Sequence, residues 1–279
     1  MGINLYHDAG HSPRMSDDGR MHPSRSEVGD PASAHDTAGG PAAQPHRFPR
    51  VTSFRARRSA LSPAQQETWD RLWPELGRHA RDEQSRPVTD LDLAAWFGRS
   101  APLILEIGSG TGTSTLEMAQ AEPDLDVIAV EVYRKGLAQL LSAIDRSTAT
   151  SSPVTNIRMV RGDGVDVLEH MIAPGALTGV RVFFPDPWPK ARHHKRRLLQ
   201  SGTVALIADR LRPGGILHAA TDHSGYAEHI AEVGDAEPRL RRVTADTELP
   251  ISVQRPVTKY ERKALAGPDV TELLWEKRP

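Results

Sequence analysis

The residues best suited to chemistry begin with three alternate glycines directly after a short apolar run. The run at 103–107 is followed by Gly108, Gly110 and Gly112, and a helical pattern starts at Thr113. Glycine lets the backbone turn sharply and lets a ligand approach without a Cβ in the way. The free amides at the start of a helix favour a ligand that carries a carboxylate or another negative group. We therefore expect a small-molecule site at this turn.

The spacing of the glycines distinguishes two classes of ligand. A dinucleotide site uses G-x-G-x-x-G, but the sixth position counted from Gly108 is Thr113. The observed G-x-G-x-G, preceded by Glu106, better suits S-adenosyl-L-methionine, which has an amino-acid head, a ribose and an adenine but no pyrophosphate. A nicotinamide dehydrogenase is therefore disfavoured.

Two further acids follow expected strands. Glu131 ends the second apolar run, where its carboxylate can accept both ribose hydroxyls, and Asp163 follows the third, where it can accept from an adenine amine. In open parallel sheets, ligands bind beyond the carboxyl ends of the strands. Each acid alone could be a cap or a turn residue. Together with Glu106, in this order and spacing, they favour a cofactor site.

A stiff loop follows the fourth expected strand. Prolines at 185, 187 and 189 surround Asp186 and Trp188 and hold them in set positions, as a preorganised site requires. A run without acids comes next: Lys190, Arg192, His193, His194, Lys195, Arg196 and Arg197. Its positive charge beside the expected reaction site favours contact with phosphates over a solvated helix start. We expect no metal site, because the two histidines lack further ligands in the run.

Composition excludes several classes of protein. The 279 residues include no cysteine, which excludes disulfides, zinc fingers and thiol nucleophiles. No apolar run approaches the roughly 18–20 residues that span a bilayer, and no secretory signal is visible, so we expect a cytoplasmic protein. The net charge of −1 is an average over unlike parts. Residues 1–46 hold three arginines and six acids, a sum of −3, which leaves +2 for residues 47–279.

A basic arm lies between residues 37 and 66, where no acid occurs. Two phenylalanines, Phe48 and Phe54, are interleaved with Arg47, Arg50, Arg55, Arg57 and Arg58. This combination suits backbone phosphates and a stacked base. An arm that docks its aromatic side chains on the domain explains it equally well, so both interpretations stay open. Balanced total charge does not exclude RNA.

These residues must be positioned by alternating strands and helices. Apolar runs at 103–107, 126–131, 157–160, 180–184 and 215–220 alternate with helical stretches at 113–121, 134–144, 165–171 and 198–211. That alternation predicts an α/β fold with a mostly parallel sheet and helices on both faces. Ser62 and Pro63 indicate the start of a helix that runs to about residue 77. We expect a second helix at 90–97. The apolar pattern at 270–275 predicts another strand, paired antiparallel. We expect a disordered extension at 1–46, the arm and its helices at 47–100, and the main domain at 101–279.

The loop and its basic run resemble the signature of the bacterial tRNA (guanine-N7-)-methyltransferase family. Pro-Asp-Pro-Trp, Lys, then Arg-His-x-Lys-Arg-Arg is complete at 185–197. Similar segments lie at 53–61, 105–108, 128–131, 220–222, 226–229 and 255–261, so the resemblance runs from about residue 47 to 277. This chain departs from the family at His223, where relatives often carry a bulkier aromatic residue or Asn. We expect no counterpart for residues 1–46 in the family.

The resemblance implies a Rossmann-like class I methyltransferase that transfers a methyl group from S-adenosyl-L-methionine to N7 of guanine 46 in the tRNA variable loop. It implies cofactor contacts by Glu106, Gly108, Gly110, Gly112, Glu131, Asp163 and Asp186, with Asp186 also catalytic. Substrate contacts would fall on Lys190, Asp222, Thr258, Lys259, Tyr260 and Glu261. RNA contacts would fall on Arg55, Arg57, Arg58, Arg192, His193, His194, Lys195, Arg196 and Arg197. The expected partner is tRNA, bound by a monomer or homodimer without metal or membrane.

The implied chemistry is physically reasonable. N7 of guanine is an unprotonated acceptor, so no strong base is required. Catalysis is then mostly positioning, which can supply about 7–11 kcal/mol, together with carboxylates near the charge that develops on the base. We expect Asp186 to orient the guanine and offset that charge. The alternatives are a methyltransferase of the same fold that acts on a small molecule or protein, and a non-catalytic module that binds RNA without a cofactor.

Overall fold

The computed structural model describes residues 52, 54, 60–89, 91–256 and 269–279. All of them belong to one compact unit, Pro49–Pro279. The predicted contacts Arg55, Arg57, Arg58 and Thr258–Glu261 lie outside the described residues, as does the expected extension at 1–46. No helix in the described ranges is long and apolar enough to cross a membrane.

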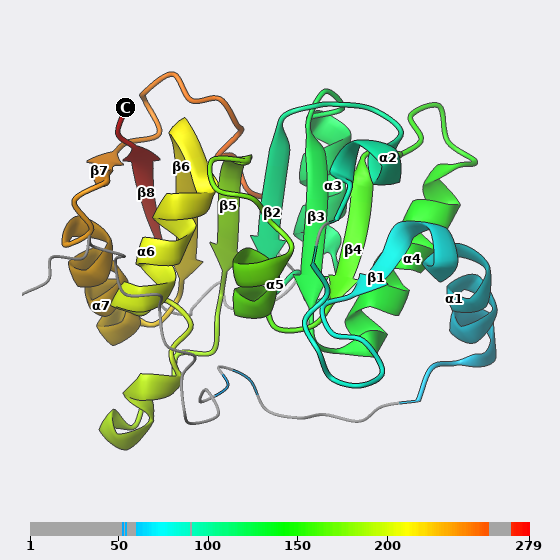
Figure 1. Cartoon of the computed structure of the whole chain (residues 1–279), viewed down its shortest axis with the longest axis horizontal. Helices are drawn as coiled ribbons and strands as arrows, with labels where there is room; N and C mark the ends of the chain where they lie inside the picture. Colours follow the sequence, from blue (N-terminus) through cyan, green and yellow to red (C-terminus); the bar gives the residue numbers. More distant parts are fainter. Residues whose placement is uncertain (1–51, 53, 55–59, 90, 257–268) are drawn as a thin grey trace, which may run out of the picture. The chain divides into compact units, whose positions relative to one another are not determined.

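An eight-stranded sheet forms the centre of this unit (Figure 1). Its order is β1-β4-β3-β2-β5-β6-β8-β7; β8 pairs antiparallel with β6 and β7, and the other pairs are parallel. The strands are β1 (Gly77–His79), β2 (Leu103–Ile107), β3 (Asp126–Glu131), β4 (Ile157–Arg161), β5 (Leu177–Phe183), β6 (Leu211–Thr221), β7 (Leu240–Val243) and β8 (Thr271–Lys277). The α/β fold with a mostly parallel sheet and an antiparallel C-terminal strand is confirmed.

The central strands agree best with the sequence. β2 and β3 coincide with the predicted runs, and every residue in them is buried, as parallel strands covered on both faces require. β5 and β6 begin earlier than predicted. The strands β1 and β7 were not predicted, because three and four residues are too few to show a period.

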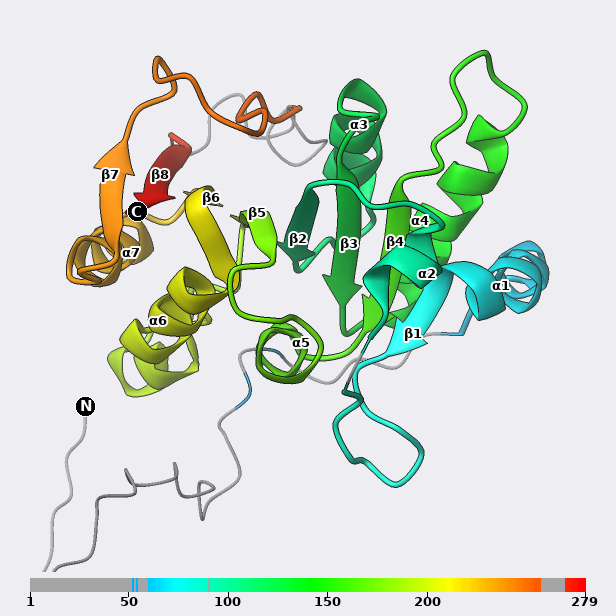
Figure 2. The ribbon, with the colours of Figure 1, turned by 45° about the horizontal axis from the view of Figure 1, so that its top comes forward.

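Helices cover both faces of the sheet (Figure 2). They are α1 (Pro63–Leu76), α2 (Leu93–Phe97), α3 (Thr113–Ala121), α4 (Arg134–Ser147), α5 (Gly164–His170), the 3-10 helix η1 (Ala191–Arg196), α6 (Ser201–Arg210) and α7 (Ser224–Asp235). Buried apolar residues of α5, α6 and α7 join one core cluster, and those of α3 and α4 join the other. The helix predicted at 198–211 begins later, at Ser201, and α7 was not predicted.

Local signals explain where two helices begin. Ser62 and Gln65 form a reciprocal capping box at α1, with Pro63 at its first position, as predicted. Asp92 caps α2 by accepting from the Ala95 amide at 2.9 Å, so this helix starts after the predicted residue 90. Both caps satisfy amides that have no partner inside the helix.

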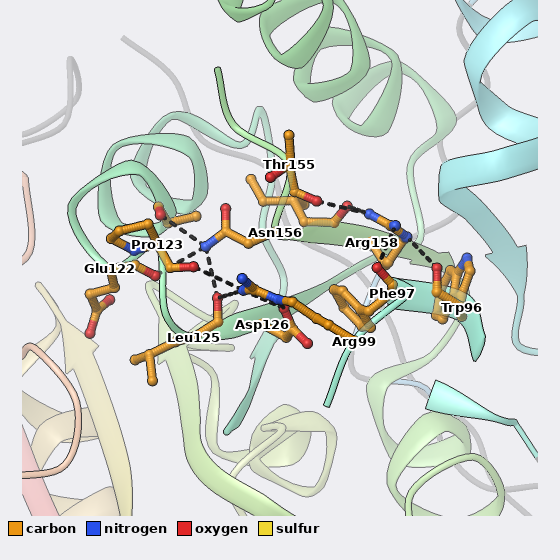
Figure 3. Close-up of polar contacts among 12 residues, drawn as sticks. Trp96, Phe97, Arg99, Glu122, Pro123, Leu125, Asp126, Thr155, Asn156 and Arg158 are labelled. Carbon is orange, nitrogen blue, oxygen red and sulfur yellow. Dashed lines mark hydrogen bonds and ion pairs between the residues drawn. The ribbon is translucent and has the colours of Figure 1, made fainter. Parts of the chain in front are cut away.

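Polar side chains anchor the amino edge of the sheet (Figure 3). The Asn156 amide donates to the carbonyls of Ala119, Glu122 and Leu125 and so fixes the end of α3. Arg99 donates to Asp126 at 2.8 Å on the neighbouring strand. These contacts hold α3, and with it the glycine turn at its other end, in register with β2 and β3.

Candidate active site

The predicted site residues gather at the carboxyl edge of the parallel strands. The arrowheads of β2 to β6 point to one edge (Figure 1), and the strand order reverses between β2 and β5. Such a switch point leaves a crevice in which α/β proteins bind ligands. The turn after β2 and the loop after β5 therefore lie on the two sides of the expected crevice.

The glycine turn is open on one side and packed on the other. Gly108, Gly110 and Gly112 have φ values of 82°, 57° and 75°, which strain other residues. A Cβ at Gly108 would meet nothing within 4 Å, whereas one at Gly112 would lie 2.6 Å from Leu140 Cβ. A Cβ at Gly136 of α4 would lie 2.1 Å from the Gly110 carbonyl oxygen. The first glycine therefore faces space for a ligand, and the third allows α4 to pack behind the turn.

Glu131 anchors the same turn. Its Oε2 accepts from the Gly110 amide and its Oε1 from the Tyr133 amide, both at 2.9 Å. Burial raises the pKa of Glu131, and the charge of Asp186 raises it further. The hydrogen bonds from these amides lower it. Each carboxylate oxygen can accept a second hydrogen bond, so Glu131 remains able to accept ligand hydroxyls. The hydrogen bond to Gly110 gives Glu131 a structural role that the sequence did not reveal.

Glu106 is buried with an unpaired oxygen. Its side chain is on β2, the residue is 3% exposed, and Oε2 has no hydrogen-bond partner among the described residues. Burial raises the pKa of Glu106, while the charge of Arg181, its register partner on β5, and the nearby Thr115 hydroxyl oppose the shift. Buried polar atoms are almost always paired. An unpaired carboxylate oxygen beside an open glycine turn fits a ligand with a positively charged amino group.

Asp163 caps a helix at the next strand end. Its Oδ1 accepts from the Val165 amide at 3.0 Å at the start of α5. A Cβ at the adjacent Gly164 would lie 2.3 Å from Ile107 Cγ2, which brings this turn against the end of β2. Glu106, Glu131 and Asp163 are thus brought to one edge, where their carboxylates can accept hydrogen bonds from an ammonium, from hydroxyls or from an amine.

The loop after β5 is held in a strained conformation. Phe184 and Trp188 have φ values of 50° and 45°, in the left-handed region, which costs about 1–3 kcal/mol for each non-glycine residue. Asp186 is exposed between them, whereas Trp188 is 4% exposed. The Arg196 guanidinium lies 4.9 Å from the centre of a Trp188 ring. The surrounding contacts therefore fix the loop and present Asp186 to solvent.

The basic run is divided between surface and interior. Lys190, Arg192 and Lys195 are exposed, and His193, His194 and Arg196 are half-buried around η1. Arg197 differs, because it is 4% exposed and its Nε donates to the Pro187 carbonyl at 2.9 Å. Its guanidinium is thus enclosed by protein, whereas the other six residues of the run remain accessible.

The turn after β6 explains the unusual His223. Asp222 is exposed, and the neighbouring His223 caps α7 by accepting from the Tyr226 amide through Nδ1 at 3.2 Å. The side chain of His223 thus does what Asn or Ser does at many helix starts. Sequence reasoning missed this cap because α7 itself was not predicted.

One group of side chains has the spacing of metal ligands in the described part of the chain. The ligand atoms of Asp166, Glu169 and His170 lie within 4.8 Å of one another. The Asp166 carboxylate, however, already accepts from Arg81 Nε at 2.7 Å and Nη2 at 3.0 Å. The group lies on α5 and contains none of the predicted site residues.

Comparisons with known proteins show which proteins this chain resembles. A family model described as "Putative methyltransferase" matches residues 100–271. The chain is 72% identical to the tRNA (guanine-N(7)-)-methyltransferase of Mycolicibacterium gilvum, over 95% of this chain and 100% of the relative. The expectation that residues 1–46 have no counterpart is therefore wrong for this relative, because its match extends into that segment. It is 76% identical to the protein of the same name from Mycobacterium sp. (strain KMS), over 84% of this chain and 83% of the relative. A solved antibiotic-resistance methyltransferase, Kmr, aligns with a TM-score of 0.45 at 16% identity, over 70% of this chain and 96% of its own.

Proposed function

This chain belongs to the tRNA (guanine-N(7)-)-methyltransferase family, and from that premise we propose how its residues methylate tRNA and where. The substrate is N7 of guanine 46 in the variable loop, and the methyl donor is S-adenosyl-L-methionine. The observation that carries this proposal is the strained loop that presents Asp186, whose charge acts on the Glu131 carboxylate that anchors the glycine turn. Exposed basic residues follow directly after this loop. The enzyme acts in the cytoplasm as a monomer or homodimer, and its chemistry requires no metal.

The cofactor would be held at the carboxyl edge of β2, β3 and β4. Glu106 Oε2 suits the ammonium of the amino-acid head, Glu131 the ribose hydroxyls and Asp163 the adenine amine. The open side of Gly108 and Gly110 leaves room beside the backbone. When bound, this cofactor supplies an electrophilic methyl group on a sulfonium. The acceptor atoms of these three carboxylates support the assignment of this ligand.

The protein's contribution to the reaction is orientation and electrostatics. The N7 lone pair needs no general base, so Asp186 orients the guanine and offsets the positive charge that the base acquires. Lys190 is exposed next to this loop, and Asp222 is exposed directly after β6. In our proposal both contact the substrate nucleotide. Thr258–Glu261, outside the described residues, complete that group in our proposal.

In our proposal, contacts with the RNA backbone offset the free-energy cost of exposing the target guanine. A guanine whose N7 is engaged in folded tRNA must first be released, at a cost on the order of a few kcal/mol. Phosphate contacts offset this cost, and we assign them to Arg192, His193, His194, Lys195 and Arg196 and to the arm residues Arg55, Arg57 and Arg58. The exposure of η1 next to the Asp186 loop supports this assignment.

The test is to map the methylated base. Unmodified tRNA transcripts are incubated with the protein and S-adenosyl-L-methionine, and N7-methylguanine is located by borohydride and aniline cleavage. We expect cleavage at position 46, and none in a matched transcript with adenosine at that position. Cleavage elsewhere would refute the positional proposal, and a transcript without any cleavage would refute the proposed use of this site.

A further inference from the structure

Arg197, the last residue of the basic run, is buried among backbone carbonyls. Besides the bond from Nε to Pro187, its Nη1 donates to the Gly225 carbonyl at 3.1 Å and its Nη2 lies 3.2 Å from His194 Nε2. The guanidinium carbon is 4.8 Å from the centre of the Tyr226 ring. No carboxylate pairs with Arg197 within the described part of the chain. All three nitrogens of the fork are therefore used to join protein segments.

These contacts connect the three segments that carry the proposed reaction. Pro187 lies between Asp186 and Trp188 in the strained loop, and His194 lies in η1. Gly225 is in the first turn of α7, directly after the segment that begins with Asp222. A single planar guanidinium reaches all of them, and a lysine ammonium, which lacks this fixed fork, would not.

The residues around Arg197 make its position rigid. The Tyr226 hydroxyl accepts from the Leu199 amide at 3.1 Å, and His229 Nε2 lies 3.0 Å from the Leu199 carbonyl oxygen. Burial raises the pKa of Tyr226 to about 12, so this hydroxyl stays protonated at neutral pH. The chain on the C-terminal side of Arg197 is thus fixed to α7, and the guanidinium projects from a fixed base.

We propose that Arg197 is a positioning residue that sets the place of Asp186 by holding the Pro187 carbonyl and that links this loop to η1 and to the start of α7. The inference rests on the proposed function, because it assigns the consequence of the link to the Asp186 carboxylate. Phosphates that bind the exposed residues of η1 would thereby act on the same rigid unit that carries Asp186. Arg197 itself does not touch the RNA.

The test separates turnover from RNA binding. In Arg197→Met, which keeps an unbranched apolar stem but loses every donor, we expect kcat to fall about 10–100-fold, since misplacement of a reacting group by about 1 Å costs on this scale. KM for tRNA should stay within about twofold, and the slope of log K against log salt should not change. For comparison, Lys195→Gln should raise KM and make the slope shallower by about 0.7–0.9.

Controls distinguish a local effect from loss of the fold. Arg239→Met removes a guanidinium that donates to the Ala205 carbonyl at 2.8 Å, near β7 and outside the site; it should lower the Tm and leave kcat unchanged. Affinity for S-adenosyl-L-methionine, measured by calorimetry, should be retained in Arg197→Met. If that variant does not fold, Arg197→Lys provides the same test, because it keeps the charge and loses the fork. We expect its kcat to fall as well.

Three results would overturn the inference: a shallower salt slope with unchanged kcat in Arg197→Met, wild-type parameters in that variant, or wild-type kcat in a folded Arg197→Lys. The first would make Arg197 a phosphate contact. The wild-type protein is measured in the same assay. If the wild-type protein itself does not methylate tRNA, the proposed function fails, whereas wild-type turnover combined with any of the three results contradicts the positioning role alone.

Discussion

The unpaired oxygen of Glu106 leads us to predict that one substitution raises the stability of the protein and lowers its affinity for the cofactor. Glu106→Gln keeps the shape of the side chain and removes its buried charge. Because burying a carboxylate charge costs more than burying the neutral amide that replaces it, the cofactor-free variant should be more stable than the wild type by about 1–3 kcal/mol. A stabilisation of this size corresponds to a Tm increase of roughly 2–12 °C at this chain length.

The neighbouring Arg181 reduces this gain but does not reverse it, because burial affects Glu106 more strongly than the attraction of the guanidinium does. Its Nη2 keeps the ion pair with Glu122 at 2.6 Å and the bond to the Ser252 carbonyl at 3.0 Å when Glu106 becomes neutral. Glu122→Gln is the matched control, because it removes the carboxylate that does pair with this buried guanidinium. That variant should be less stable than the wild type. The two substitutions, each of which replaces a glutamate near Arg181 by glutamine, should therefore shift the Tm in opposite directions.

The pH dependence gives an independent check. Burial raises the pKa of Glu106 above the ordinary carboxyl value of 4.5. For an acid with a raised pKa in the folded state, stability is fully present below the unfolded pKa and is lost as the pH rises through the folded pKa. The advantage of Glu106→Gln should therefore be largest at pH 8 and shrink as the pH falls toward 4.5.

Cofactor affinity should change in the other direction. A hydrogen bond to a charged group is worth about 1.5–3 kcal/mol, so Glu106→Gln should weaken binding of S-adenosyl-L-methionine by about 10–150-fold. Denaturation with and without cofactor measures stability, and calorimetry measures affinity. If the Tm of the cofactor-free Glu106→Gln variant at pH 8 is equal to or lower than that of the wild type, the buried charge of Glu106 does not destabilise the protein and the reasoning is refuted.

Three further predictions follow from the same site. Asp186→Ala should lower kcat by about 100–1,000-fold, the loss typical when a group that stabilises transition-state charge is removed, and near wild-type single-turnover rates at saturating cofactor would contradict its catalytic role. The six cations that we assign to phosphates, Arg55, Arg57, Arg58, Arg192, Lys195 and Arg196, should give tRNA binding a salt slope of about −4.2 to −5.4 at 0.7–0.9 per contact. Filter binding that is flat in salt would exclude this RNA surface. His223→Ala should destabilise the protein by about 1 kcal/mol through loss of the α7 cap, and His223→Asn should restore it; equal unfolding free energies of Ala and Asn variants would show that the cap contributes nothing.

The sequence could predict the parts of the site that depend on local geometry. Alternate glycines require left-handed φ values wherever the chain turns after β2, and prolines at 185, 187 and 189 stiffen any loop that contains them. The apolar runs of β2 and β3 are long and uniform, so their limits were visible. The same holds for α3 and for the capping box at Ser62. In these places the physical cause lies within a few residues of its effect.

Only the tertiary structure decided which side chain does what within a motif. Lys195 and Arg197 lie in one unbroken basic run, yet the first is exposed and the second is enclosed by Pro187, Gly225 and Tyr226. Glu131 was expected to be a ligand for ribose, and its hydrogen bond to Gly110 of the glycine turn became visible only when β3 was placed beside β2. The reason is that burial and hydrogen bonding depend on which distant segments cover a residue. Residue type and spacing thus determined the chemistry available to this protein, and packing determined which atoms are free to perform it.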